Sequence, residues 1–451
     1  MKKLTVILIV SVSAALALSC ARMSEKAEKY PAPSLTELTV GCEVLDRDYT
    51  DYDQYKEYLP ELGAGIIRLQ AGWAKTEKVK GEYDFAWLDH IVDDALSRGL
   101  RIWLQTSYGN PIYEGGGTIN LGGGIPVSDE AKAAWDNWVR AMAEHYKGRV
   151  HEWEIWNEPD LSEKISAADV AELNVRTASI IKSVDPDAQI AALALCVLSP
   201  EFLEECMECL ASTGRLDLFT WVSYHGYEYR PEDSYEGVEA FKEVLSRYEP
   251  VLLLRQGENG APSKGHMGGA LDNYDWTELS QAKWDLRRMA GDRGHDVQSS
   301  VFSIIDMAYP PGVNQYVTKM NVKGLIEADS LKRAVRRKAA FEAVANYASV
   351  LKKLVRREDP SRISFDGMDH CEYNLYTSAD GVPAVLLWDS SSAPLNENNY
   401  REVALKVDGV QFDSPVWYDI RTGEISDLES LDAVTIYDSP VMITEKSNIA
   451  L

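Results

Sequence analysis

Short apolar runs alternate with amphipathic segments along most of this 451-residue chain, and this alternation limits the folds that it can adopt. In FAWLDHIVDDALSRG at 85–99, the apolar residues recur at helical spacing, so that one face of a helix would be buried. Such a segment follows each apolar run of strand length. The runs are TVGCEVL (39–45), GIIRLQAG (65–72), RIWLQTS (101–107), VHEWEIWNE (150–158), QIAALAL (189–195), LFTWVSYH (218–225), PVLLLRQGE (250–258) and SSVFSIID (299–306).

Eight strand-and-helix units predict an α/β fold, and most simply a (β/α)8 TIM barrel. Strands that are apolar on both faces are typical of a parallel sheet covered by helices, and eight units are the number that closes such a barrel. A doubly wound open sheet is the alternative fold. That sheet usually has a glycine-rich phosphate-binding turn after its first strand, whereas DRDYT at 46–50 contains no glycine. We therefore expect a barrel over residues 36–356.

The pattern changes after the eighth helix. CEYNLYTS, ADG and VPAVLLWDS have the pattern of a strand, a turn and a strand, and PVWYDIRTGEI and AVTIYDSPVMITE show the same alternation. Residues 357–451 are therefore predicted to form a small all-β, sandwich-like domain. Two long segments, 108–126 and 307–324, follow strands three and eight at the face where barrels carry their active sites, so we expect them to form a lid or the walls of a cleft.

The N-terminus has the pattern of an export signal over residues 1–19. A pair of lysines precedes the apolar run LTVILIVSVSAALALS, which is shorter than the roughly 20 residues of a membrane-spanning helix. The segment resembles a bacterial lipoprotein signal, in which the cysteine after a small residue is lipidated. The resemblance implies lipidation at Cys20, a tether over 20–35, and an exported protein held on a membrane only by its lipid, on the periplasmic or the outer surface.

Composition excludes several classes of partner and cofactor. With 46 Lys+Arg against 71 Asp+Glu, the formal charge of −25 disfavours nucleic acid and anionic lipid surfaces and suits a neutral substrate. The cysteines are irregularly spaced, which argues against a disulfide framework. Cys206 and Cys209 form a CxxC without a second CxxC or histidine pair, so no metal site and no cofactor are expected.

Two of the apolar runs end on a glutamate. Glu158 ends the fourth run, and Pro159 after it cannot continue a strand ladder. Glu258 ends the seventh run between Gly257 and Asn259, where glycine permits the close approach of backbone or ligand. In a barrel, both carboxylates would lie at the same mouth. Paired carboxylates across a cleft are what glycoside hydrolysis requires.

The motifs WNEP at 156–159 and GENG at 257–260 resemble clan A of the retaining glycoside hydrolases. The resemblance implies Glu158 as the acid/base and Glu258 as the nucleophile. Four further positions match clan motifs in supporting or substrate-binding roles. These are Arg68 beside the nucleophile, Asn157 at the sugar 2-hydroxyl, and His225 and Tyr227, whose hydroxyl would touch the nucleophile.

Aromatic residues near strand ends are candidates for stacking on sugar faces. They are Trp73, Tyr108, Trp156, Tyr224 and Tyr309. The clan's usual tryptophan on strand eight has no match in SIIDM at 303–307, which leaves Tyr309 or Asp306 as replacements.

The barrel with its appended β domain, together with LGAGIIRLQAGWAKTE and PVWYDIRTGEI, resembles glycoside hydrolase family 39, which includes β-xylosidases and α-L-iduronidases. GENG is closer to other families of the clan, such as family 5. The resemblance implies a retaining β-glycosidase that acts on a polysaccharide or oligosaccharide. An endo-acting β-glucanase or β-mannanase and a non-catalytic glycan-binding lipoprotein are the alternatives. HEWEI lacks the second histidine of a zincin, and the chain has no GxSxG elbow.

Overall fold

Eight parallel strands form one sheet, in the order β7-β6-β5-β4-β3-β2-β1-β8. The computed structural model describes residues 34–310 and 320–449. The strands are β1 (Leu38–Gly41), β2 (Ala64–Gln70), β3 (Arg101–Thr106), β4 (Glu152–Ile155), β5 (Gln189–Leu195), β6 (Trp221–Tyr224), β7 (Leu253–Gln256) and β8 (Ser300–Val301). Parallel bridges from Arg255 to Gln298 and from Asn259 to Val301 join the two edges, so the sheet closes. The predicted barrel is confirmed, and every expected strand is present.

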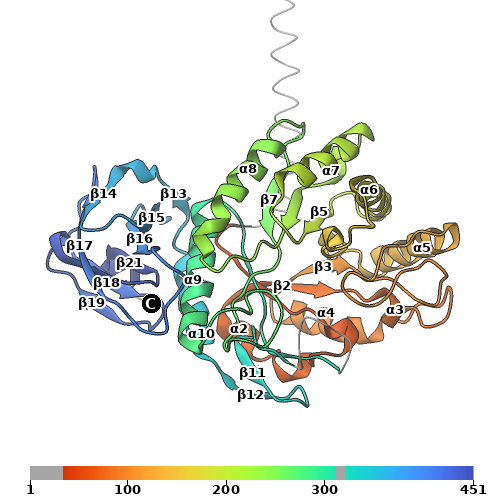
Figure 1. Cartoon of the computed structure of the whole chain (residues 1–451), viewed down its shortest axis with the longest axis horizontal. Coiled ribbons are helices and arrows are strands. Elements are labelled where there is room, and N and C mark those ends of the chain that lie inside the picture. The colour runs from red at the N-terminus through yellow and green to blue at the C-terminus, as the bar shows by residue number, and fades with distance from the viewer. Residues whose placement is uncertain (1–33, 311–319, 450–451) are drawn as a thin grey trace, which may run out of the picture. The chain divides into compact units, whose positions relative to one another are not determined.

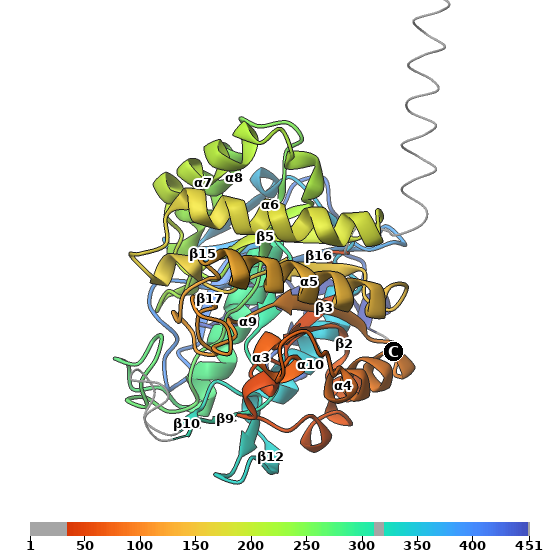
Figure 2. The same ribbon diagram turned by 90° about the vertical axis from the view of Figure 1, so that its right-hand side faces the viewer.

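Helices follow the strands and cover the outside of the sheet, as α5 and α6 do side by side in Figure 2. They are α4 (Ala86–Ser97), α5 (Asp129–Tyr146), α6 (Ala167–Val184), α7 (Pro200–Ser212), α8 (Tyr235–Leu245), α9 (Glu278–Gly294) and α10 (Ala339–Leu351). Side-chain caps fix several of their first turns. At α6, for example, Ser166 and Asp169 form a reciprocal capping box. Within the described part of the chain, no helix is long and apolar enough to cross a membrane.

The helix expected after the first strand, at 51–63, is mostly absent. A 3-10 turn at Tyr52–Gln54 and the short α2 (Tyr58–Leu62) stand in its place. Pro60 is accommodated because it lies in the first turn of α2, where no backbone N–H is needed. Gly63 then ends the helix with a left-handed φ of 78°. The short α3 (Trp73–Thr76) follows β2.

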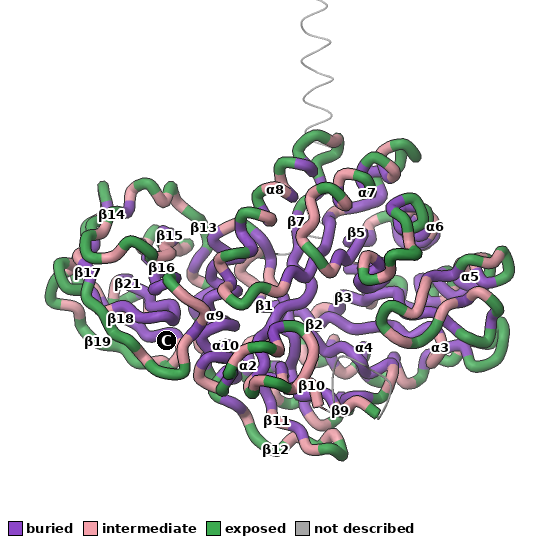
Figure 3. The backbone as a smooth tube through the Cα atoms, viewed as in Figure 1, coloured by how far each residue is buried: buried purple, intermediate pink, exposed green. Residues whose placement is uncertain are grey.

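The strands of the barrel, labelled in Figure 1, are mostly buried, as Figure 3 shows. One apolar layer consists of Ile66, Trp103, Ala191 and Trp221. The guanidinium of Arg255 lies 3.6 Å from the ring centroid of Trp103 and pairs with Glu152 at 2.6 Å. The strands thus deliver polar and charged side chains into the interior, and these continue up to the mouth.

After α10 the chain is almost entirely β, as predicted. A six-stranded sheet, β13-β15-β16-β21-β18-β19, faces a three-stranded sheet, β14-β17-β20, across a core of its own. The strands are β13 (Arg356–Arg357), β14 (Ile363–Asp366), β15 (Cys371–Thr377), β16 (Pro383–Asp389), β17 (Arg401–Val407), β18 (Pro415–Asp419), β19 (Ile425–Asp427), β20 (Val434–Ile436) and β21 (Val441–Glu445). Consecutive strands β20 and β21 belong to different sheets, which ties the two layers of the sandwich together.

Side chains of the barrel bind this β region directly. Trp388 Nε1 donates to Glu232 at 2.7 Å, and Lys283 Nζ pairs with Asp438 at 2.7 Å. The boundary between residues 356 and 357 stays a prediction as a division into separate folding units. The signal peptide, Cys20 and most of the tether fall outside the described residues, as do residues 311–319 of the loop after β8.

Candidate active site

The backbone presents Glu158 at the barrel mouth through a strained turn. After β4 ends at Ile155, both Trp156 and Glu158 have left-handed φ values, 63° and 50°. Pro159 then opens a 3-10 turn, and the Glu158 N–H donates to Ala194 O at 2.9 Å. Non-glycine residues held in this region of φ are concentrated at functional sites. The turn that Pro159 was expected to force is therefore the element that aims the carboxylate.

Glu258 follows β7 in a segment that tolerates no larger neighbours. A Cβ on Gly257 would lie 3.2 Å from the His225 ring, and one on Gly260 would lie 1.9 Å from Phe302 O. The close approach predicted for these glycines is confirmed. They allow the Glu258 carboxylate to lie against the next strand and beside His225.

The two carboxylates face each other across a short gap. A carboxylate oxygen of Glu158, a carboxylate oxygen of Glu258 and a ring nitrogen of His225 all lie within 4.8 Å of one another. Carboxyl groups are about 5 to 5.5 Å apart in retaining glycosidases and about 6.5 to 9.5 Å apart in inverting ones. The separation here is that of a retaining pair.

Arg68, at the end of β2, holds the nucleophile candidate in place. Its Nη1 donates to Glu258 Oε1 at 3.1 Å and to Glu43 Oε1 at 2.9 Å, and its Nε donates to Glu154 Oε2 at 2.7 Å. Its Nη2 donates to Asn157 Oδ1 at 3.0 Å. Gln105 Nε2 donates to the same oxygen, so the amide NH2 of Asn157 is left to face a ligand.

His225 and Tyr227 complete the group. His225 Nδ1 lies 2.6 Å from Glu158 Oε1 and 3.6 Å from Glu258 Oε2, and Tyr227 donates to Glu258 Oε2 at 3.3 Å. Burial by itself would lower the pKa of His225, but the charges of Glu258 and Glu158 outweigh it, so this pKa is raised. Burial and the same two charges raise the pKa of the Tyr227 hydroxyl, which therefore stays a donor. The residues predicted from the motifs thus converge on one site.

The sequence reasoning missed Glu43, a third carboxylate at this site. The first strand was expected to run to residue 45, which would have made Glu43 an interior strand residue, but β1 ends at Gly41. Burial raises the pKa of Glu43 to about 8 against the opposing charge of Arg68, and the charge of Glu258 adds to the rise. Among the described residues, its Oε2 has no hydrogen-bond partner.

A cleft of about 870 Å³ opens above these groups. Of the predicted aromatic residues, Tyr108 and Tyr309 line it. Phe302, directly after β8, also lines it, although the sequence reasoning did not single it out. Asp306 does not reach the cleft, because its carboxylate binds Lys338 Nζ at 2.6 Å. Further polar residues of the lining that the sequence reasoning missed are Arg47, Gln70 and Lys323.

The structure does not bring Trp73 and Trp156 to the cleft surface. Trp73 is fully buried, stacks on Tyr113 and Trp138, and donates its Nε1–H to Glu77 at 2.5 Å. Trp156 packs against Trp135 with its ring almost completely covered. Tyr224 is likewise buried and packs on Phe241 of α8. Since α3 and the strand ends turn these rings outward, they support the barrel wall rather than offer a face to a sugar.

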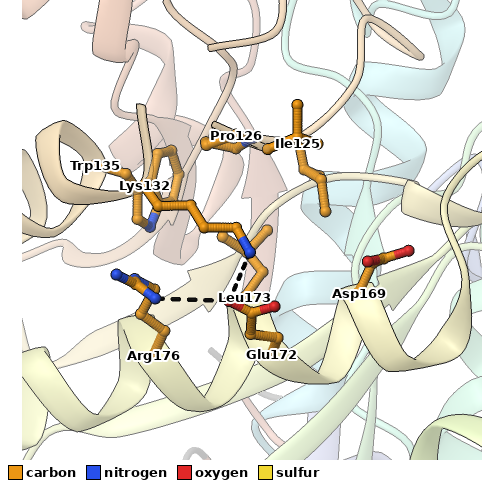
Figure 4. Close-up of a pocket in the computed structure, with 9 residues that line it drawn as sticks. Ile125, Pro126, Lys132, Trp135, Asp169, Glu172, Leu173 and Arg176 are labelled. Atoms are coloured by element: carbon orange, nitrogen blue, oxygen red, sulfur yellow. Dashed lines mark hydrogen bonds and ion pairs between the residues drawn. The ribbon is translucent and has the colours of Figure 1, made fainter. Parts of the chain in front are cut away.

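A second, smaller cavity of about 110 Å³ lies between α5, α6 and the segment at 125–127. Its charged groups neutralise one another, since Glu172 pairs with Lys132 at 2.7 Å and with Arg176 at 3.6 Å (Figure 4). This cavity has no group poised for proton transfer or nucleophilic attack. The chemistry therefore belongs to the cleft at the barrel mouth.

Known proteins with similar sequences include glycoside hydrolases. Over residues 35–251, the chain matches the sequence profile described as glycosyl hydrolases family 39. Over that range the chain is similar to family 39. This confirms the resemblance seen in the sequence. The matched range contains Glu158 and His225 and ends before β7, so the place of Glu258 rests on its own geometry.

The individual relatives with similar sequences are also glycosidases by name. The chain is 27% identical to a β-xylosidase of Geobacillus stearothermophilus over 229 residues, which are 45% of this chain and 45% of that protein. It is 32% identical to β-galactosidase BbgII of Bifidobacterium bifidum over 116 residues, 21% of this chain and 17% of that one. The matches thus span less than half of the length of these curated relatives.

Solved structures share the fold of this chain. A family 39 glycoside hydrolase of Bacteroides cellulosilyticus WH2 superposes with a TM-score of 0.65 at 16% identity, covering 91% of this chain and 80% of that one. A monomeric β-xylosidase of Caulobacter crescentus CB15 gives 0.61 at 16% identity, covering 90% and 95%. At these coverages both likenesses extend into the C-terminal β region, so the shared fold includes most of the described chain.

Proposed function

We propose that the protein is a retaining β-glycosidase of the β-xylosidase type. The observation that carries this proposal is the pair of carboxylates, Glu158 and Glu258, with oxygens within 4.8 Å of one another at the mouth of the barrel. The match to family 39 and the similarity to a β-xylosidase support the reaction class. A carbohydrate is the substrate class that fits this chemistry.

In the first step, the Glu158 carboxyl gives its proton to the glycosidic oxygen while a Glu258 oxygen attacks the anomeric carbon. The bond from that carbon to the leaving oxygen breaks, the alcohol departs, and a glycosyl ester forms on Glu258. In the second step, Glu158 takes a proton from water, whose oxygen attacks the same carbon and releases Glu258. Two inversions give net retention, and Glu158 regains its proton.

Neighbouring groups prepare each carboxylate for its role. Arg68 donates to Glu258 at 3.1 Å and Tyr227 donates at 3.3 Å, so the nucleophile is oriented and its negative charge is stabilised. The NH2 group of Asn157, whose oxygen is already bound by Arg68, is available for the sugar 2-hydroxyl. The mechanism uses no metal, although Glu158, His225 and Glu258 are close enough together to ligate one.

The test is hydrolysis of a panel of aryl β-glycosides and β-linked oligosaccharides, with the anomer of the first product followed by NMR. Wild type should release the β-anomer first. Glu158→Gln and Glu258→Gln should each lose about 100- to 10,000-fold or more in kcat, the range that proton transfer and nucleophilic attack contribute. An α-anomer as the first product, or full activity in either variant, would rule out the proposed mechanism.

We also propose that the enzyme is exported and anchored through a lipid on Cys20. The lysine pair, the apolar run and the small residue before Cys20 support this localisation. Fractionation of cells that express the full chain should find it with the membranes, and Cys20→Ser should prevent lipidation. A wild-type protein recovered without a lipid would contradict the proposal.

A further inference from the structure

The loops beside Glu158 place exposed apolar side chains in the cleft, together with the polar residues Asn120 and Asn157. Leu121, in the loop after β3, and Leu161, in the turn after β4, line the cleft with 38% and 46% of their surface open to solvent. Val197 is 55% exposed and directly follows Cys196, which lines the cleft after β5. We call Leu121, Leu161 and Val197 the apolar ledge. Its members come from three successive loops, with the Glu158 loop in the middle.

The ledge is fixed to the catalytic turn. The carboxylate of Asp160 accepts hydrogen bonds from the backbone N–H groups of Cys196 at 2.8 Å and Val197 at 3.0 Å. The Leu161 N–H donates to Glu158 O at 3.2 Å. One short turn therefore aims the Glu158 carboxylate, carries Leu161 and is bound to the backbone at Val197. Such a surface is in place before a ligand arrives, which lowers the entropic cost of binding.

The loops after β1, β7 and β8 supply several charged side chains to the cleft. Glu43 and Arg47 follow β1, Asp272 lies in the loop after β7, and Lys323 comes after β8. Lys323 Nζ donates to Gly260 O at 2.6 Å and lies 4.8 Å from the Tyr227 ring centroid. These groups can donate to and accept from sugar hydroxyls, whereas the side chains of the ledge can do neither. These charged groups, which we call the polar half of the cleft, suit a sugar, whereas the ledge suits an apolar group.

The proposed mechanism decides which part of a substrate meets each half. Glu158 must touch the glycosidic oxygen, so the group that leaves with this oxygen lies along the Glu158 side. Single exposed leucines are ordinary on protein surfaces, but here they adjoin the proposed catalytic acid inside one cleft. A sugar at this position would place hydroxyls against side chains that cannot bind them.

We propose that the leaving-group side of the cleft accepts an apolar aglycone, so that the substrate is a β-glycoside of an aryl or long-chain alkyl alcohol rather than an oligosaccharide. This inference rests on the proposed function and narrows it. The glycone would occupy the polar half, and the aglycone would cover Leu121, Leu161 and Val197 as it binds.

The test is a series of alkyl β-D-xylosides, β-D-glucosides and β-D-galactosides with methyl, butyl, hexyl and octyl chains. Their leaving alcohols are nearly equal in basicity, so chain length changes contact and not chemistry. On the sugar that is cleaved, kcat/KM should rise about 2- to 4-fold per methylene while the chain contacts the ledge, the upper value being that of a fully buried CH2. The octyl glycoside should also be cleaved faster than the disaccharide of the same sugar.

Variants of the ledge residues test whether the ledge causes the dependence of kcat/KM on chain length. In Leu121→Asn/Leu161→Asn, the ratio of octyl to methyl kcat/KM should fall by about ten-fold or more, which is the contribution of two or more buried methylenes. Leu161→Met keeps the apolar surface and should keep the ratio. Leu331→Asn removes a leucine that is 68% exposed and does not line the cleft, and it should behave as wild type.

The outcomes separate this inference from the proposed function. A rate that does not depend on chain length, or a disaccharide cleaved faster than the octyl glycoside, would overturn the apolar aglycone and leave the β-glycosidase intact. A double variant that keeps the wild-type ratio would do the same. If wild type cleaves none of the aryl glycosides, alkyl glycosides or oligosaccharides, the proposed function fails and this inference fails with it.

Discussion

His225 Nδ1 lies 2.6 Å from Glu158 Oε1, so the proposed acid/base shares a short hydrogen bond with a buried imidazole. The same nitrogen is 3.6 Å from Glu258 Oε2. A proton held at Nδ1 therefore interacts with both catalytic carboxylates.

Because the pKa of His225 is raised above 6.5 in the folded protein, protonated His225 stabilises the fold at low pH. This contribution is complete below the unfolded value of about 6.5 and is lost as the pH rises through the folded value. We expect His225→Asn to lower Tm most at pH 5 to 6, with the difference from wild type shrinking toward pH 9. Thermal unfolding across this range measures it, and a difference that grows with pH would show that the imidazole is neutral in the folded protein.

Glu43 makes a second pH-dependent contribution to the stability of the fold. Its pKa rises from 4.5 to about 8 on folding, so the folded state holds a proton that the unfolded chain loses. Stability from this group is complete below about pH 4.5 and is lost as the pH rises through 8. Glu43→Gln mimics the protonated form. Its Tm relative to wild type should therefore increase between pH 5 and pH 9, whereas a constant offset would mean that Glu43 is already ionised at pH 5.

Arg68 contacts Glu43, Glu154 and Glu258 at the same time. Removing one partner of a buried ion pair costs about 3 to 5 kcal/mol because the remaining charge is left uncompensated. We expect a loss of at least this size in the unfolding free energy of Arg68→Met, measured by urea denaturation. Arg333→Met is the matched control, since Arg333 pairs with Asp329 at the surface and should have little effect. Equal effects of the two variants would contradict the network.

The fold could be predicted from the sequence because each barrel strand is a continuous apolar run and each run is followed by a helical pattern. Glu158 and Glu258 could be predicted because each ends such a run at the catalytic face. The acidic partners of Arg68 could not be predicted from the sequence. Glu43 and Glu154 lie 25 and 86 residues from Arg68 along the chain, and their inward orientation depends on where β1 ends and on the register between strands.

The apolar ledge was also invisible in the sequence. Leu121, Leu161 and Val197 carry no motif, and they come from three separate loops, two of which bring a leucine to the same cleft as Glu158. For Trp73 the error is the reverse, because the sequence predicted a sugar-binding role for a residue that does not reach the cleft. An aromatic residue just after a strand looks like a sugar platform, but the short helix α3 turns its ring into the barrel wall.

Trp73 should therefore affect stability and leave substrate binding alone. Its ring is fully buried between Tyr113 and Trp138, and its Nε1–H donates to Glu77. Trp73→Phe removes this hydrogen bond and part of the packed volume, so we expect a loss of about 1 to 3 kcal/mol in unfolding free energy. KM for an aryl glycoside should stay at the wild-type value, whereas Tyr309→Ala, inside the cleft, should raise it. If Trp73→Phe raised KM without lowering Tm, the ring would have to reach the substrate, and the buried position of Trp73 would be wrong.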